Sequence, residues 1–383
     1  MTEPNAPERE LLPPSPLCCL KFNPKSHETL VGGSYNGLVT YYDLRKPGAG
    51  PAETSQIEHS HHDPVYDIFW IASKTGSKCA SVSTDGLMLW WDVRKLSEPE
   101  DSVQLTDKQI EGTVLGGSSM EYNSEAGANK YLVGTEQGMP VKIDLKARKP
   151  PAASGVAIYD AGVARHHGPI YTIQRNLLHT KFFLTVGDWT ARVWAEDNTK
   201  SPIMTTKYHD AYLTSGAWSP TRAGVFFVTR NDGVMDVWDY FHDQKEITYT
   251  FKVGDDPLSS IAVEGTTGKY VAVGDEAGTV SLVELSRPLY EPTPGEKAAV
   301  GLMMEREAKG EKNLELRERD MRRAKAAEKK NASGADEVAP GGRDEAMEEL
   351  LRKVDADFLA KIRDVEDDEA KNSDPAPADG DEF

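Results

Sequence analysis

The sequence predicts an all-β fold, a propeller of about six blades, followed by an α-helical and partly disordered C-terminal tail. The first observation is a hairpin signal, in which a turn residue precedes the closing residue of a strand by six; it occurs six times. The second is the distance between successive turns, 44 to 52 residues, which is typical of propeller blades with four short strands. The third is a change of composition near Pro288, beyond which helix-favouring Ala, Glu, Lys and Arg dominate.

Each repeat is organised around its turn. The turn residues are Gly37, Gly86, Gly138, Trp189, Gly233 and Gly278. Glycine supplies the positive φ that a tight hairpin turn requires. An alternating run such as VTYYD, residues 39–43, follows each turn and predicts a strand, and an apolar run such as CASVS, residues 79–83, precedes it. Inner strands such as VYDIFW, residues 65–70, open each repeat, whereas outer strands such as EITYTF, residues 246–251, are less distinct.

Three repeats depart from this pattern. Pro140 stands inside a strand of the third repeat, where it removes a donor of the hydrogen-bond ladder. In the fourth repeat Trp189 replaces the turn glycine and Ala195 replaces the closing Asp. The sixth repeat closes with Val283-Glu284. The strand pattern nevertheless persists in all three, so we expect six blades over residues 17–287.

The N-terminal segment, residues 1–16, holds five prolines and cannot form a blade. A propeller normally closes by pairing a strand from the other terminus with its last blade, which covers an open sheet edge. Residues 9–12 are the candidate for that strand, because residues 286–296 after the sixth repeat are too rich in proline. The sequence therefore predicts an imperfectly closed ring that is less stable than a complete one.

The charge and the cysteines restrict the class of protein. The formal net charge is −18 and the pI is about 5.0, which disfavours nucleic acid and anionic membranes as partners. Cys18, Cys19 and Cys79 cannot form a disulfide framework and fit a reducing setting, where they are expected to pack as small apolar residues. The N-terminus has no apolar signal core, and no run of about 18 apolar residues occurs.

No motif for catalysis is present in the sequence. It has no Gly-rich phosphate loop, no GxSxG and no HExxH, and acids such as Asp67 and Asp236 are scattered along the repeats. The pairs His61-His62 and His166-His167 suggest a metal site at first sight. Adjacent residues of a strand point apart, and no Cys or carboxylate lies at ligand spacing, so structural histidines are the better interpretation. We therefore expect no catalytic residue, no cofactor and no metal.

The repeats resemble WD repeats, with the dipeptide itself at Trp91-Asp92 and Trp238-Asp239. In such repeats a histidine before the inner strand links a strand Ser or Thr, the turn Asp and the strand Trp. By this resemblance the structural network comprises His62, Ser83, Asp85 and Trp91 in the second repeat, His167, Asp188 and Trp194 in the fourth, and His209, Asp232 and Trp238 in the fifth. Trp90 points the other way and is expected in the seam between two blades, and Trp70 and Trp218 are expected in the core.

Longer strings give a closer resemblance. The stretches HHDPVYDIFWIASKTGSKCASVSTDGLMLWWDVRKLSEP, FFLTVGDWTARVWAED and YLTSGAWSPTRAGVFFVTRNDGVMDVWD resemble the dynein intermediate chains, with the smaller WD-repeat chain of the axonemal outer arm as the best match. The resemblance covers roughly residues 10–330. It implies a subunit of the axoneme, assembled first in the cytoplasm, that binds a dynein heavy-chain tail and a sister intermediate chain. The light-chain-binding region of the family precedes the first repeat seen here, so the chain resembles a shortened family member.

The tail has three parts. Residues 288–340 comprise a charged helical segment and a flexible break, and residues 367–383 form an acidic stretch expected to be disordered. Between them, residues 341–366 predict an amphipathic helix. Its candidate partner-binding face carries Leu351, Val354, Phe358, Ile362 and Val365. This helix either docks a dynein partner or folds back onto the propeller.

Two functional classes follow from these features. One is a non-catalytic structural subunit of the outer dynein arm, in which the heavy chain alone hydrolyses ATP. The other is a general WD-repeat adaptor outside the axoneme, in which an open propeller face binds a short peptide.

Overall fold

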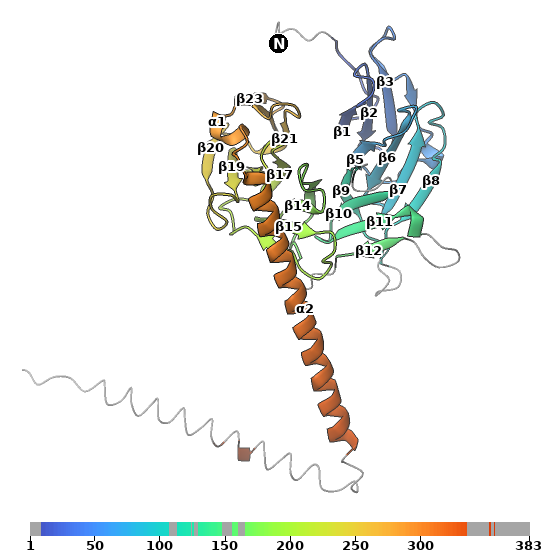
Figure 1. The fold of residues 1–383 in the computed structure, drawn as a ribbon. Helices are drawn as coiled ribbons and strands as arrows, with labels where there is room; N and C mark the ends of the chain where they lie inside the picture. The colour runs from blue at the N-terminus through green and yellow to red at the C-terminus, as the bar shows by residue number, and fades with distance from the viewer. Residues whose placement is uncertain are drawn as a thin grey trace, which may run out of the picture. The chain divides into compact units, whose positions relative to one another are not determined.

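The computed structural model describes residues 9–106, 113–123, 125, 129–147, 155–159, 165–334, 352, 353 and 356. The chain forms two compact units, residues 1–315 and residues 316–383. The first unit contains six antiparallel sheets that follow one another along the chain as propeller blades (Figure 1). The predicted propeller with six repeats and a helical C-terminal segment is confirmed.

Blades 1 to 3 each have four strands, paired in chain order. Blade 1 consists of β1 (Leu17–Phe22), β2 (Thr29–Ser34), β3 (Val39–Asp43) and β4 (Glu53–Thr54), and is followed by the 3₁₀ turn η1 (Ile57–His59). Blade 2 consists of β5 (Val65–Trp70), β6 (Lys78–Ser83), β7 (Leu87–Asp92) and β8 (Asp101–Gln104). Blade 3 consists of β9 (Gly117–Tyr122), β10 (Lys130–Thr135), β11 (Pro140–Asp144) and β12 (Val156–Ile158), with η2 (Leu145–Ala147) before its last strand.

Blades 4 and 5 also have four strands, whereas three strands of blade 6 are described. Blade 4 consists of β13 (Ile170–Arg175), β14 (Phe182–Gly187), β15 (Thr190–Ala195) and β16 (Met204–Thr205). Blade 5 consists of β17 (Leu213–Trp218), β18 (Val225–Arg230), β19 (Val234–Asp239) and β20 (Tyr249–Lys252). Blade 6 consists of β21 (Leu258–Val263), β22 (Tyr270–Asp275) and β23 (Val280–Glu284).

The innermost strands of neighbouring blades lie side by side, in the order β1, β5, β9, β13, β17 and β21. Each strand has a register shift near its start. In blades 1 to 4, the residue after the shift hydrogen-bonds the next blade. The bonds are Cys19 Sγ to Val65 O (3.4 Å), Met120 N to Asp67 Oδ2 (2.9 Å), Ser119 Oγ to Ile170 O (2.8 Å) and Gly216 N to Thr172 Oγ1 (3.3 Å). These polar contacts fix the blades around a central cavity.

The ring is open between blades 6 and 1. Among the described residues, no comparable contact joins β21 to β1. Phe22 is 57% exposed, although Trp70 at the same ladder position of blade 2 is 6% exposed. Val280, two residues after the turn of blade 6, is 72% exposed, whereas Val39 at the same position of blade 1 is 0% exposed. The structure thus has two exposed seam faces, as the prediction of imperfect closure requires.

The described N-terminal residues, from residue 9 onward, do not pair with blade 6. Arg9 Nη2 donates to the carbonyl of Lys46 at 2.8 Å, and Leu12 N donates to the carbonyl of Ala49 at 2.7 Å. Both acceptors lie in the loop between β3 and β4 of blade 1. The predicted role of residues 9–12 as a closing strand is therefore wrong for this structure, because their polar groups bind the first blade instead.

Over residues 287–334, blade 6 is followed by the helices α1 (Arg287–Tyr290) and α2 (Glu296–Gly334). The second includes residues 331–334, which the sequence assigned to a flexible break. Within the first unit, Val300, Met304 and Ala308 repeat every four residues and are buried against blades 4 and 5. No helix in the described part of the chain is apolar enough, over sufficient length, to cross a bilayer.

The tryptophans of blade 2 lie where the sequence placed them. Trp91 is 0% exposed, and Trp90 packs in the seam with blade 3, where its ring meets Tyr131 edge to face at 5.5 Å. Trp70 and Trp218 are buried. Cys79 is buried as well, but Cys18 is exposed, because the second residue of an inner strand faces the central cavity. The expected packing role is therefore wrong for Cys18.

Candidate interaction surfaces

Blade 2 contains a buried relay of four polar side chains. His61 Nδ1 lies 3.0 Å from Asp85 Oδ2, and His61 Nε2 lies 2.8 Å from Ser81 Oγ. Trp91 Nε1 donates to the same hydroxyl at 2.8 Å. Burial acts to raise the pKa of Asp85, but hydrogen bonds from His61 and from the backbone N–H groups of Leu87 and His62 together hold the pKa below its usual range. The relay ties the loop before β5 to β6, the turn and β7.

Two members of this relay differ from the prediction, which named His62 and Ser83. The His62 side chain points away, and only its backbone N donates to Asp85, at 3.1 Å. The Ser83 hydroxyl donates to the carbonyl of Asp63 at 3.1 Å. Successive side chains of an extended segment point in opposite directions, so His61 faces the core and His62 does not. Ser81 pairs with Leu89 in the β6–β7 ladder and lies level with the Trp91 ring.

Blade 4 repeats the relay with Thr185 as the hydroxyl. His166 Nε2 lies 2.8 Å from Thr185 Oγ1, and Trp194 Nε1 donates to it at 2.9 Å. His166 Nδ1 lies 3.3 Å from Asp188 Oδ1. His166 therefore takes the place predicted for His167, for the same reason of alternation, whereas Asp188 and Trp194 occupy the predicted roles. Asp188 has a φ of 50°, so it supplies the left-handed residue that glycine supplies in the other turns.

Blade 5 has a rewired relay. His209 Nδ1 lies 2.8 Å from Asp236 Oδ2, on strand β19, whereas the predicted Asp232 pairs with Arg230. Val228 stands at the ladder position that Ser81 and Thr185 occupy in blades 2 and 4. Because valine has no hydroxyl, His209 Nε2 and Trp238 Nε1 are buried without a hydrogen-bond partner. In this blade the carboxylate that pairs with the histidine thus lies on strand β19 instead of in the turn.

These relays are structural. Both ring nitrogens of His61 have hydrogen-bond partners within the protein; His166 is bonded through Nε2, and its buried Nδ1 lies 3.3 Å from Asp188 without a hydrogen bond. Among the described residues, no cluster of three or more His, Cys, Asp or Glu side chains could hold a metal ion. The surfaces of the propeller are therefore the candidates for a binding site.

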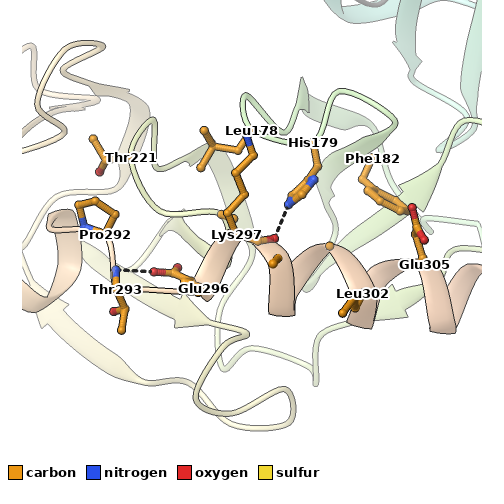
Figure 2. A pocket seen from close by; sticks show the side chains of 14 residues that line it. Leu178, His179, Phe182, Thr221, Pro292, Thr293, Glu296, Lys297, Leu302 and Glu305 are labelled. Carbon is orange, nitrogen blue, oxygen red and sulfur yellow. Dashed lines mark hydrogen bonds between the residues drawn. The ribbon is translucent and has the colours of Figure 1, made fainter.

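The first surface lies where α2 meets blades 4 and 5. Arg222 is buried and pairs with both Asp239 and Glu296, each at 2.9 Å. His179 Nε2 lies 2.9 Å from the carbonyl of Lys297, which fixes the first turn of the helix (Figure 2). A cavity of about 710 Å³ opens beside this turn. Its lining includes Leu178, Phe182, Pro292, Leu302 and Glu305.

The second surface is the central cavity, which has a volume of about 560 Å³ and is lined by the inner strands of all six blades. Its charged lining consists of Asp67, Glu121 and Lys21. Burial raises the pKa of Glu121 to about 7, although Arg175 Nε donates to it at 3.1 Å and opposes this rise. Tyr66 and Tyr171 lie at the exposed end of the lining.

The third predicted surface falls outside the described residues. Leu351, Val354, Phe358, Ile362 and Val365 are the candidate partner-binding positions of the C-terminal helix, and the structure describes none of them. The pairing of Arg222 with Glu296 on α2, which we call the Arg222 clamp, was not predicted from the sequence, because the two residues are 74 apart in the chain. The Arg and Glu residues carry no local signal of that pairing.

Comparisons with known proteins give one consistent family. A sequence model of the dynein axonemal intermediate chain 3 WD40 domain matches residues 116–285. The chain is 45% identical to the 70 kDa intermediate chain of the flagellar outer-arm dynein of Chlamydomonas reinhardtii, over 94% of this chain and 61% of that one. It is 49% identical to the ciliary dynein intermediate chain 3 of Heliocidaris crassispina, over 83% of this chain and 52% of that one.

The human relative is similar to the same degree. Dynein axonemal intermediate chain 2 of Homo sapiens is 45% identical over 94% of this chain and 58% of its own length. The chain therefore spans between about half and three fifths of the length of these relatives. The resemblance to dynein intermediate chains that the sequence strings indicated is confirmed.

Proposed function

We propose that this homologue of the axonemal dynein intermediate chains is a non-catalytic intermediate-chain subunit of a ciliary or flagellar outer dynein arm. The observation that carries the proposal is the identity shared with a flagellar outer-arm intermediate chain over nearly the whole of this chain. The shared region covers 94% of this chain. Homology of this extent supports a common role in the assembly.

The role proposed is that of a scaffold. The propeller binds the tail of a dynein heavy chain and pairs with a sister intermediate chain. The loops around His61, at residues 73–78 and at residues 252–257 are candidates for these contacts, since loops carry most binding residues. The subunit is assembled in the cytoplasm and then resides on the axonemal microtubules.

The chain is proposed to carry out no reaction of its own. The histidines of blades 2 and 4, His61 and His166, are engaged in the structural relays described above. Hydrolysis of ATP is assigned to the heavy chain. The purified chain is expected to hydrolyse ATP no faster than a heat-denatured control.

Fractionation of a tagged full chain in cells with motile cilia tests the proposal. We expect the chain in isolated axonemes, its release by high salt, and its co-sedimentation with outer-arm heavy chains. Axonemes from a strain without outer arms provide the control, and they should not retain it. Recovery in cytosol or nuclei alone would contradict this proposal and support the adaptor function. Retention in axonemes that have no outer arms would also contradict the proposal.

The C-terminal helix is proposed to be one contact of this assembly. Burying its five apolar side chains gives about 7–15 kcal/mol, and association costs of about 4–15 kcal/mol offset most of that gain. The helix is therefore a weak anchor that acts together with other contacts. Phe358→Ala should lower the recovery of partners in co-precipitation about fivefold or more. Lys353→Ala, on an exposed residue of the same segment, is the matched control, and equal recovery with both variants would exclude the docking role.

A further inference from the structure

An exposed aromatic surface lies at the turn end of blades 4 and 5. We call it the aromatic rim and define it as Tyr171, Trp189, Tyr208 and Tyr212. Trp189 is 43% exposed, and all six other tryptophans of the chain are buried. Tyr171 and Tyr208 are exposed as well. Three of these rings form one group, since Tyr212 meets Trp189 edge to face at 5.2 Å and meets Tyr171 edge to face at 5.9 Å.

The turn of blade 4 does not need this tryptophan. Its left-handed residue is Asp188, and Trp189 occupies the other tip position of a two-residue turn. The turns of the other five blades have a glycine with positive φ, and none of them carries a tryptophan, although Tyr35 in the turn of blade 1 is also exposed. An exposed Trp contributes nothing to core packing, yet Trp and Tyr are the side chains that dominate the affinity of protein interfaces. The aromatic rim therefore has the composition of a binding surface.

The charge beside the aromatic rim is negative. His209 N donates to the carbonyl of Trp189 at 2.9 Å, which places the neighbouring Asp210 next to the tryptophan. The side chain of Asp210 is 93% exposed. Arg230 is the cation facing it, at 3.8 Å, and this guanidinium also contacts Asp232 and Asp236. Asp210 is the most exposed of these three carboxylates and has the longest contact with Arg230, so it can pair with a further cation.

The central cavity continues the same chemistry. Tyr171 belongs both to the aromatic rim and to the lining of the cavity. That lining holds Asp67 and Glu121 against Lys21. A chain that lies over the rim and reaches the cavity mouth therefore meets further aromatic side chains, Tyr66 and Tyr171, whose faces attract a cation.

We propose that the aromatic rim binds an extended, arginine-bearing segment of a partner protein, with the guanidinium stacked on Trp189 and paired with Asp210. Arginine fits better than lysine, because a planar guanidinium stacks on an indole and pairs with a carboxylate at the same time. The partner surface is thus basic, opposite in sign to this chain.

Binding to short peptides tests this proposal on the purified full chain. The probe is a ten-residue Gly/Ser peptide with two central arginines, and the same peptide with citrulline or glutamate in their place serves as a reference. Fluorescence anisotropy gives the affinity. Acrylamide quenching reports on Trp189 directly, because the other tryptophans are buried. The arginine peptide should bind and shield Trp189, and the citrulline and glutamate peptides should not.

Variants then assign the contact to the aromatic rim. Trp189→Ala should weaken arginine-peptide binding about tenfold or more, Trp189→Phe should retain part of it, and Asp210→Asn should reduce its dependence on salt. Tyr249→Ala, on an exposed aromatic residue of β20, is the matched control and should change nothing. Equal urea midpoints for all variants would show that they fold alike. The proposal is overturned if the arginine peptide does not bind, if citrulline binds equally well, or if Trp189→Ala binds like the unaltered chain.

Discussion

The relay of blade 2 allows a prediction that separates two neighbouring serines. Replacing Ser81 by alanine removes the hydroxyl that accepts from Trp91 Nε1 and contacts His61 Nε2, each at 2.8 Å. When His61 donates from Nδ1 to the Asp85 carboxylate, its Nε2 is an acceptor, so the hydroxyl donates to it. The change therefore leaves one buried donor and one buried acceptor without partners.

The expected cost follows from these two groups. A buried polar group left without its hydrogen bond costs about 1–3 kcal/mol, so Ser81→Ala should lower the free energy of unfolding by about 2–6 kcal/mol. That is a large fraction of the roughly 5–15 kcal/mol available to a folded protein. Ser83→Ala loses the bond of 3.1 Å that the hydroxyl donates to the carbonyl of Asp63 and the longer one, 3.4 Å, that it accepts from Asp85 N, and should cost about 1–2 kcal/mol.

Urea unfolding, followed by tryptophan fluorescence and far-ultraviolet circular dichroism, measures both changes as shifts of the midpoint. Ser81→Thr is the conservative control, since blade 4 uses a threonine hydroxyl at the same ladder position. It should recover most of the stability that Ser81→Ala loses. Equal midpoints for Ser81→Ala and Ser83→Ala would refute the reasoning, because they would show that the relay does not pass through Ser81.

Three further predictions concern other blades. Val228→Thr places a hydroxyl beside the unpartnered His209 Nε2 and Trp238 Nε1 and should raise the free energy of unfolding by about 1 kcal/mol; a lower urea midpoint would contradict the proposed equivalence of the three blades. Burial raises the pKa of Glu121 to about 7, so the protonated carboxyl favours the folded state. The stability that Glu121 contributes is therefore lost as the pH rises from the ordinary pKa of glutamate toward 7. Glu121→Gln should flatten the pH dependence of the urea midpoint over that interval, and an unchanged slope would exclude this group as its source. Val280→Thr should change the free energy of unfolding by less than about 0.5 kcal/mol, whereas Val39→Thr, at the equivalent buried position, should cost about 1–3 kcal/mol; equal losses would show that blade 6 is covered.

The propeller could be predicted from the sequence because its signals are local. A turn residue, the alternating strand after it and the spacing between repeats all lie within one blade, and the structure has a blade wherever this pattern occurs. The seam position of Trp90 followed from the same alternation. The outer strands were less distinct, since strands such as β4 and β16 are two residues long and partly exposed, and so leave little apolar pattern.

The relay residues were harder to predict, because the choice depends on register rather than on residue type. His61 and His62 are chemically identical, and only the direction of the side chain decides which one meets Asp85. In blade 5 the carboxylate lies on a strand instead of the turn, a change that the hairpin pattern does not reveal. The Arg222 clamp joins segments far apart in the chain and could only come from the fold.

The exposed apolar residues of this propeller have two different causes, and a closed ring would distinguish them. Phe22 and Val280 stand at positions where other blades bury a side chain in a seam, so their exposure follows from the opening between blades 6 and 1. Trp189 stands at the tip of a turn, where no blade buries a side chain against its neighbour, so the opening does not explain its exposure. Any element that fills the seam should therefore protect Phe22 and Val280 from solvent and leave the acrylamide quenching of Trp189 unchanged. For that reason the aromatic rim remains available to a partner whether or not the ring is completed.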